Sequence, residues 1–126
     1  METIEEKDLK SSLESDFLSL MGQIDKQNVS YVEEALHKDY HDSVWIKGAS
    51  GVFSSTKDDY LGYLSKGKIG GMDRKVEIRN LEILDQFGII RSKLESNVMK
   101  FDGGFTFFLE NNQWKLIKVV MVAEKK

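Results

Sequence analysis

The spacing of apolar residues changes partway along this chain of 126 residues, and that change limits the folds that the chain can adopt. In the N-terminal part, apolar side chains recur at every third or fourth position, which is typical of helices that bury one face. From about residue 75 onward, short runs rich in valine, isoleucine and phenylalanine are separated by turn signals. The sequence therefore predicts an α+β fold, in which N-terminal helices precede an antiparallel sheet.

The first helix is expected from Thr3 to about Lys26, and Thr3 with Glu6 has the spacing of a capping box. Its apolar stripe consists of Leu9, Leu13, Phe17, Leu20, Met21 and Ile24. Gly22 interrupts this stripe and costs about 1 kcal/mol relative to alanine, so a close backbone approach or a kink is expected there. A long helix with one apolar stripe is expected to lie on a flat surface.

Two shorter helices are expected next. Ser30 and Glu33 have the spacing of a second capping box, which predicts a short helix directly after the first. The runs "SVWIKG" and "GVFSS" then read as short strands on either side of a glycine turn. A third helix is capped by Thr56 or Ser55 and ends at Gly67.

The rest of the chain reads as an antiparallel meander. Its apolar runs are "RKVEIRNLEIL", "GIIRSKLESNVMKF", "GFTFFLE" and "QWKLIKVVMVA", and the turns between them are placed at "DQFG", "DG" and "NN". In the first run Val76 and Ile78 share one face, whereas Leu81 and Ile83 share the other, so a β-bulge is predicted near Asn80. A sheet bent in this way and covered by helices leaves a cone with a pocket at its open end.

Composition narrows the classes of function. The chain is long enough for one domain, placed at residues 1–126, and has no cysteine, which excludes thiol chemistry and zinc–cysteine sites. The formal charge of −3 argues against nucleic acid or an anionic membrane as a partner. We expect a cytoplasmic protein, because no apolar run is long enough to span a membrane and the acidic N-terminus does not resemble a secretory signal.

Several stretches together resemble the nuclear transport factor 2-like (NTF2-like) superfamily, and within it the SnoaL-like branch, also labelled lumazine-binding. They are "MGQIDKQN", "EEALHKDYHDSVWIKG", the third helix around "DDYL", and the C-terminal "TFFLENNQWKLIKV". The resemblance covers about Phe17 to Val122. It implies a cystatin-like roll, in which three N-terminal helices cover the concave face of a strongly bent sheet. It also implies a homodimer formed through the outer face of that sheet.

The resemblance does not imply one reaction, because members of this superfamily include enzymes, transport adaptors and binding proteins. Enzymes of the superfamily carry a carboxylate base in a strand that corresponds here to about Val44–Lys47, and no acidic residue stands there. Steroid-isomerising members use a phenol from the first helix, where this chain offers Phe17. Both departures argue against an isomerase.

The stretch "HKDYHD" contains both histidines of the chain and is a candidate site. On a regular strand, His37, Asp39 and His41 would share one face, as metal ligands or an acid–base pair would. The favoured interpretation is instead that this stretch ends the second helix and turns into the first strand, with Asp39 bonding local backbone amides. His41 and Asp42 are weaker candidates for a general base, and we expect no metal and no cofactor.

Seven residues are candidates for the wall of a ligand pocket. They are Phe17, Met21, Trp45, Tyr60, Lys93, Phe107 and Trp114. The aromatic members can equally be ordinary core residues, and Tyr60 and Trp45 are the first choices for the pocket. Lys93 and Glu95 lie on one face of their strand, and we expect that face to point to water rather than inward.

These observations lead to three hypotheses about function. The first is a non-catalytic protein that binds a small apolar or aromatic molecule in the pocket. The second is an enzyme of the isomerase, dehydratase or cyclase type, in which His41 or Asp42 is the general base and Tyr60 or Lys93 polarises a carbonyl. The third is a dimeric assembly module whose cone is filled by its own side chains.

Overall fold

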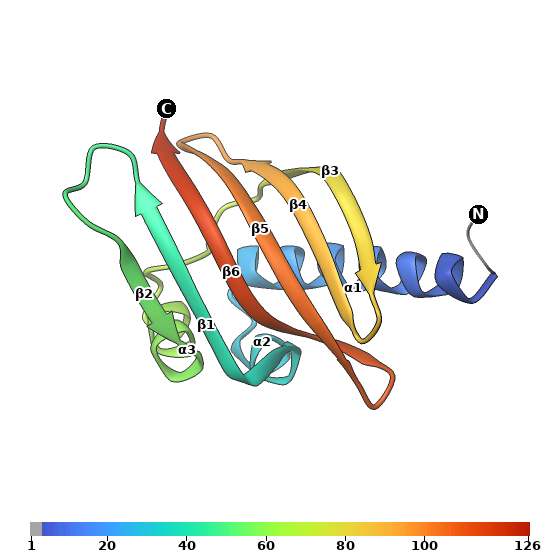
Figure 1. The fold of residues 1–126 in the computed structure, drawn as a ribbon. Coiled ribbons are helices and arrows are strands. Elements are labelled where there is room, and N and C mark those ends of the chain that lie inside the picture. Colours follow the sequence, from blue (N-terminus) through green and yellow to red (C-terminus); the bar gives the residue numbers. More distant parts are fainter. Residues whose placement is uncertain (1–3) are drawn as a thin grey trace.

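The computed structural model describes residues 4–126 and confirms the predicted α+β fold (Figure 1). Three helices and six strands follow one another along the chain. They are α1 (Ile4–Asp25), α2 (Val29–Ala35), β1 (Leu36–Ile46), β2 (Phe53–Thr56), α3 (Lys57–Ser65), β3 (Lys75–Leu84), β4 (Phe87–Glu95), β5 (Met99–Glu110) and β6 (Gln113–Lys125). None of the helices in this described part is long and apolar enough to cross a membrane.

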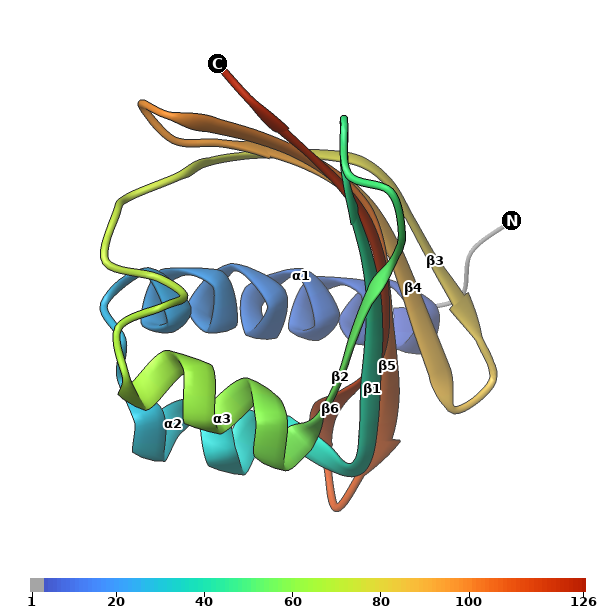
Figure 2. The same cartoon turned by 90° about the vertical axis from the view of Figure 1, so that its left-hand side faces the viewer.

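The six strands form one sheet in the order β2-β1-β6-β5-β4-β3. Strands β3 to β6 make the predicted antiparallel meander, and β1 joins its edge by pairing parallel with β6. The sheet curves over the three helices, which all lie on its concave side (Figure 2). The fold is therefore the open cone that the sequence predicts.

Register shifts mark where the sheet bends. One falls between Ile78 and Asn80 of β3, which confirms the bulge predicted from the change of apolar face. A second falls between Thr106 and Phe107 of β5, against β6. Because each bulge increases the local twist, the sheet wraps around α1 instead of lying flat against it.

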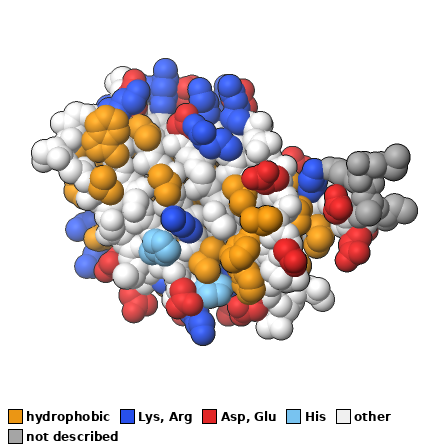
Figure 3. Space-filling model, viewed as in Figure 1, with side chains coloured by type: hydrophobic (Ala, Val, Ile, Leu, Met, Phe, Trp, Pro, Cys, Tyr) orange, Lys and Arg blue, Asp and Glu red, His pale blue; other side chains and the backbone are white. Residues whose placement is uncertain are grey.

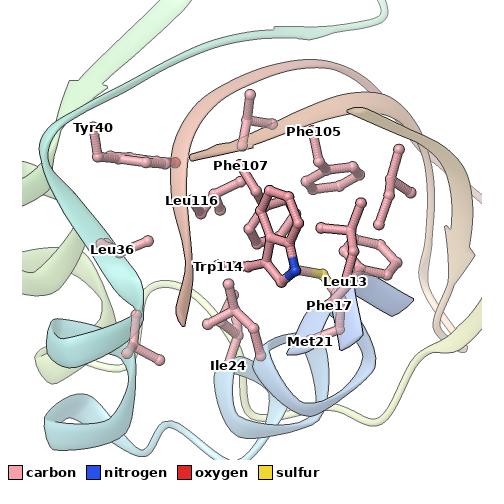
Figure 4. Packing of buried hydrophobic residues seen from close by; sticks show 14 of the residues in the cluster. Leu13, Phe17, Met21, Ile24, Leu36, Tyr40, Phe105, Phe107, Trp114 and Leu116 are labelled. Carbon is pink, nitrogen blue, oxygen red and sulfur yellow. The ribbon is translucent and has the colours of Figure 1, made fainter. Parts of the chain in front are cut away.

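The core fills the space between α1 and the sheet. Leu13 and Phe17 of α1 are fully buried, and the ring of Phe17 meets the rings of Phe105 and Phe107 edge to face, with centroids 5.0 and 6.2 Å away (Figure 4). Trp114 closes one end of this cluster, where its indole Nε1 donates to the hydroxyl of Ser12 at 2.9 Å. The apolar stripe predicted for the first helix is the face that makes this core.

Two of the three predicted helix starts can be compared with the structure. Thr56 caps α3, and a complete capping box links Thr56 with Asp59. The predicted cap at Ser30 is wrong, because the side chain of Asn28 accepts the backbone N–H of Tyr31 and the helix already begins at Val29. The capping box proposed for Thr3 lies outside the described residues.

One predicted turn is wrong. Asp102 and Gly103 lie inside β5, and the chain instead turns after β4, where the hydroxyl of Ser96 accepts the N–H groups of Val98 and Met99. Glycine suits position 103 of this strand because β6 passes close by: a Cβ at Gly103 would lie 3.0 Å from the carbonyl oxygen of Val120. The predicted "NN" turn is confirmed, since both asparagines have positive φ, at 51° and 61°.

Candidate ligand-binding cavity

A cavity of about 490 Å³ lies on the concave side of the sheet. It is bounded by β1, β5 and β6, by the C-terminal end of α1, and by the 66–74 segment that links α3 to β3. Most of its wall is apolar, with Ile24, Phe105 and Met121 among the lining residues. A larger hollow of about 840 Å³ lies over β3–β6 and is lined by lysines mixed with acidic residues. The concave cavity is the better candidate, because it combines an apolar wall with a few buried polar groups.

Strand β1 places its polar residues according to the alternation of a strand. It begins directly after Ala35, so the predicted helix exit through "HKDYHD" is wrong. Tyr40 and Asp42 are buried and line the cavity, whereas His41 between them is exposed on the other face. Asp42 is thus the acidic residue that β1 brings to the cavity, two positions before the segment where the resemblance places a base.

Tyr40 and Asp42 form a hydrogen-bonded pair in the cavity wall. The phenol of Tyr40 donates to Oδ2 of Asp42 at 2.5 Å, and both residues are at most 5% exposed. Burial raises the pKa of Tyr40, and the nearby Tyr60 and the hydrogen bond to Asp42 raise it further. Tyr40 therefore stays protonated and remains the donor in this pair.

Tyr60 of α3 stands beside this pair. Its ring meets that of Tyr40 edge to face, with centroids 5.6 Å apart. Burial also raises the pKa of Tyr60, so its phenol remains a hydrogen-bond donor at neutral pH. The Tyr40, Asp42 and Tyr60 side chains together give the cavity one polar corner, which we call the β1 corner.

A second polar group in the wall joins α1 to the segment before β3. Arg74 donates from Nε to Oδ1 of Asp25 at 2.6 Å and from its backbone N–H to Oδ2 at 3.1 Å. The guanidinium carbon of Arg74 also lies 5.4 Å from the centre of the Phe101 ring. Since both charges are nearly buried and satisfied by each other, this pair fixes the cavity wall.

The two histidines of "HKDYHD" do not share one site, although Nδ1 of His37 lies 3.8 Å from the carboxylate of Asp39. The ring of His37 faces Glu110, with Nε2 3.5 Å from the carboxylate, and meets the ring of Phe108. Asp39 and His41 are exposed. Across residues 4–126 there is no cluster of three or more histidine or acidic side chains with metal-binding geometry. The register of β1 shifts between Leu36 and His41, so the period of two fails between His37 and Asp39 and holds from Tyr40 to Asp42.

The seven candidate pocket residues occupy three different places. Met21 and Tyr60 line the cavity. Phe17, Phe107 and Trp114 are buried in the core beside it. Trp45 and Lys93 belong to the outer face of the sheet, where Trp45 is 41% exposed. The charged face of β4 points to water, as expected, because Ser92 and Leu94 take the buried positions.

Sequence reasoning missed Tyr40, Asp25 and Arg74 as cavity residues. Tyr40 had a usable signal, because it alternates with Asp42 and Val44 if the strand is started earlier. The pairing of Asp25 with Arg74 had none, because the two residues are 49 positions apart and only the packed fold brings them together.

No family model and no curated protein matches the sequence. Solved structures do match. An NTF2-like protein of unknown function from Silicibacter pomeroyi has a TM-score of 0.78 at 11% identity, covering 91% of this chain and 95% of that one. An NTF2-like protein of unknown function from Shewanella baltica has a TM-score of 0.77 at 8% identity, covering 98% of each chain.

A third structure, a ketosteroid isomerase-like protein from Erwinia carotovora, has a TM-score of 0.69 at 13% identity, covering 90% of this chain and 95% of that one. These identities are low, so the likeness concerns the fold. The chain therefore has the NTF2-like fold, and the resemblance stated from the sequence is confirmed at this level.

Proposed function

We propose that this protein binds a small, largely apolar molecule in the concave cavity. The observation that carries the proposal is the combination of an apolar wall with the β1 corner, where Tyr40 and Asp42 are buried, in a space of about 490 Å³. Pockets of about 300–1,000 Å³ with a few buried polar groups are typical of small-molecule sites. The apolar wall supplies affinity, and the corner orients the polar end of the ligand.

Native mass spectrometry of the protein purified from its own cells tests this proposal. We expect a retained small molecule in the wild-type protein. Met121→Trp fills the cavity and should abolish retention, whereas Val120→Trp, on the outward face of the same strand, should preserve it. Equal retention by both variants, or none by the wild type under gentle ionisation, would contradict binding in this cavity.

Acid–base catalysis is the second candidate, and the position of Asp42 favours it. Asp42 and Tyr60 line the same cavity, whereas His41 and Lys93 are exposed outside it, and this arrangement supports the second candidate. In such an enzyme the Asp42 carboxylate would take a proton from carbon next to a carbonyl. The electron pair of that C–H bond would move to the carbonyl oxygen, which the protonated phenol of Tyr60 would stabilise.

Deuterium incorporation into 4-phenylbutan-2-one in D₂O tests this second candidate. Wild-type protein should speed exchange next to the carbonyl, and Asp42→Asn should return the rate to that of buffer. Asp39→Asn is the matched control, because Asp39 lies on the same strand but is exposed to solvent. If deuterium exchange with the wild-type protein is no faster than in buffer, Asp42 does not act as a general base on such a ketone.

We also propose that two copies associate through the outer face of the sheet. Trp45 and Val120 are exposed there, and the face carries groups of apolar side chains with charged side chains of both signs around them (Figure 3). Some of these charges are paired within one copy, as in Arg91 with Asp102 and Lys47 with Glu124, each at 2.8 Å, which reduces repulsion between like charges when two faces meet. We further propose that the protein is cytoplasmic and belongs to the SnoaL-like branch of the superfamily.

A further inference from the structure

The two carboxylates in the cavity wall differ in how their charge is balanced. Asp25 has Arg74 as a cationic partner at 2.6 Å. Asp42 has one hydrogen-bond partner, the neutral phenol of Tyr40, and forms no ion pair within residues 4–126. It is nevertheless only 5% exposed. A buried carboxylate is costly unless a cation or several donors balance it, so the wall holds one acidic group with spare accepting capacity.

Aromatic residues lie close to the polar groups at both ends of the cavity wall. At the Asp25 end, the guanidinium of Arg74 lies over the ring of Phe101 while it pairs with the carboxylate. At the β1 corner, the hydroxyl of Tyr40 contacts Asp42 and the ring of Tyr60 meets that of Tyr40. Lys68 and Arg74 line the same cavity, but no side chain from residues 4–126 forms an ion pair with Asp42. Aromatic faces attract cations, and a carboxylate beside them adds a charge-assisted hydrogen bond.

We infer that the cavity selects a small apolar molecule that carries a primary amine, whose ammonium group pairs with Asp42 beside Tyr40 and Tyr60. This inference rests on the proposed function and names the class of ligand. The ammonium donates to the carboxylate of Asp42, beside the hydroxyl of Tyr40 and the ring of Tyr60. The apolar part of the ligand occupies the space lined by Phe105, Val119 and Met121.

Three probes of similar size and different charge separate this inference from its alternatives. They are 2-phenylethylamine, 2-phenylethanol and 3-phenylpropionate, each titrated into the full chain and followed by amide chemical shifts in ¹H–¹⁵N spectra. We expect the amine to bind at least about tenfold more tightly than the alcohol, because its hydrogen bond to Asp42 is charge-assisted. The acid should bind most weakly, and the largest shifts should fall on Tyr40, Asp42 and Tyr60.

Two variants test whether the carboxylate of Asp42 causes the preference for the amine over the alcohol. Asp42→Asn keeps the shape but removes the charge, so the amine and the alcohol should then bind within about threefold of each other. Asp39→Asn, an exposed acid on the same strand, should keep the wild-type preference. The comparison of probes on the wild-type protein stands even if Asp42→Asn fails to fold.

The possible outcomes distinguish a failure of the amine assignment from a failure of the proposed binding function. If the alcohol or the acid binds as tightly as the amine at the same residues, the cavity is a binding site but the amine assignment is overturned. A preference for the amine that survives in Asp42→Asn also overturns it. If no probe shifts the cavity residues at millimolar concentration, the proposed function fails together with the inference.

Discussion

Arg74 and Asp25, 49 residues apart in the sequence, form a nearly buried ion pair that fastens the segment before β3 to the end of α1. The backbone N–H of Arg74 and its Nε both donate to the same carboxylate. The pair thus holds one side of the cavity closed, where the chain between α3 and β3 has no regular structure.

Replacing Arg74 by methionine is the first test of this role. The change leaves Asp25 buried without its cation, so we expect the free energy of unfolding in urea to fall by about 3 kcal/mol or more. Arg79→Met is the matched control, because Arg79 pairs with Glu77 in solvent within β3 and its loss should matter little. Equal stability of the two variants would show that the buried pair does not hold the wall.

Gly70 allows the same segment to pass close to α1. Its φ is +79°, and a Cβ at this position would collide with the carbonyl oxygen of Ile24, so there is no room for a side chain. We expect Gly70→Ala to lower the free energy of unfolding by more than about 2 kcal/mol.

Gly22→Ala is the opposite case and serves as the control. A Cβ at this helix position would meet nothing within 4 Å, so of the two alternatives expected there, a close backbone approach or a kink, the close approach is wrong. Alanine should stabilise the protein by about 1 kcal/mol, because it is the better helix former. Thermal unfolding of Gly22→Ala and Gly70→Ala checks both expectations. A Gly70→Ala variant more stable than the wild type would contradict the close passage of the 66–74 segment along α1.

Alkaline pH tests the two phenols of the β1 corner. The pKa values of Tyr40 and Tyr60 are raised in the folded protein, so their contribution to stability is complete below the ordinary value of about 10. That contribution is lost as the pH rises above this value. Urea midpoints between pH 8 and 11 should therefore fall, and Tyr60→Phe should make the fall less steep. An unchanged slope in this variant would place Tyr60 in solvent.

The outer sheet face predicts the state of assembly. We expect sedimentation equilibrium to give twice the chain mass of 14.4 kDa for the wild type. Val120→Asp puts a charge on the centre of the face, at a position 53% exposed in one copy, and should give the single-chain mass. Val52→Asp, at an exposed position in the loop between β1 and β2, should remain a dimer. A monomeric wild type would contradict this interface.

The order of elements was predictable because it depends on local patterns. The 3–4 spacing of Leu13 and Phe17 belongs to a helix, and the change of face around Asn80 required a bulge. The pattern was less informative at "HKDYHD", because polar residues on an irregular strand resemble a helix exit. The "DG" pair misled for a related reason, since glycine marks close strands as well as turns.

The candidate site was predictable only in part. Met21 and Tyr60 have the residue types of a pocket wall and do line the cavity. Trp45 has an equally suitable type but lies on the opposite face of β1, because its position in the alternation, not its chemistry, decides where it points. The partners of Asp42 and Asp25 come from packing between distant segments, which no local pattern encodes.

A crystal structure of the protein purified from its own cells tests the central claim most directly. We expect ordered density for a small molecule between the β1 corner and the end of α1, with a polar atom in hydrogen-bonding distance of Asp42 or Tyr60. Met21, Phe105 and Met121 packed together in the middle of the cavity, with no space left for a ligand, would contradict the claim.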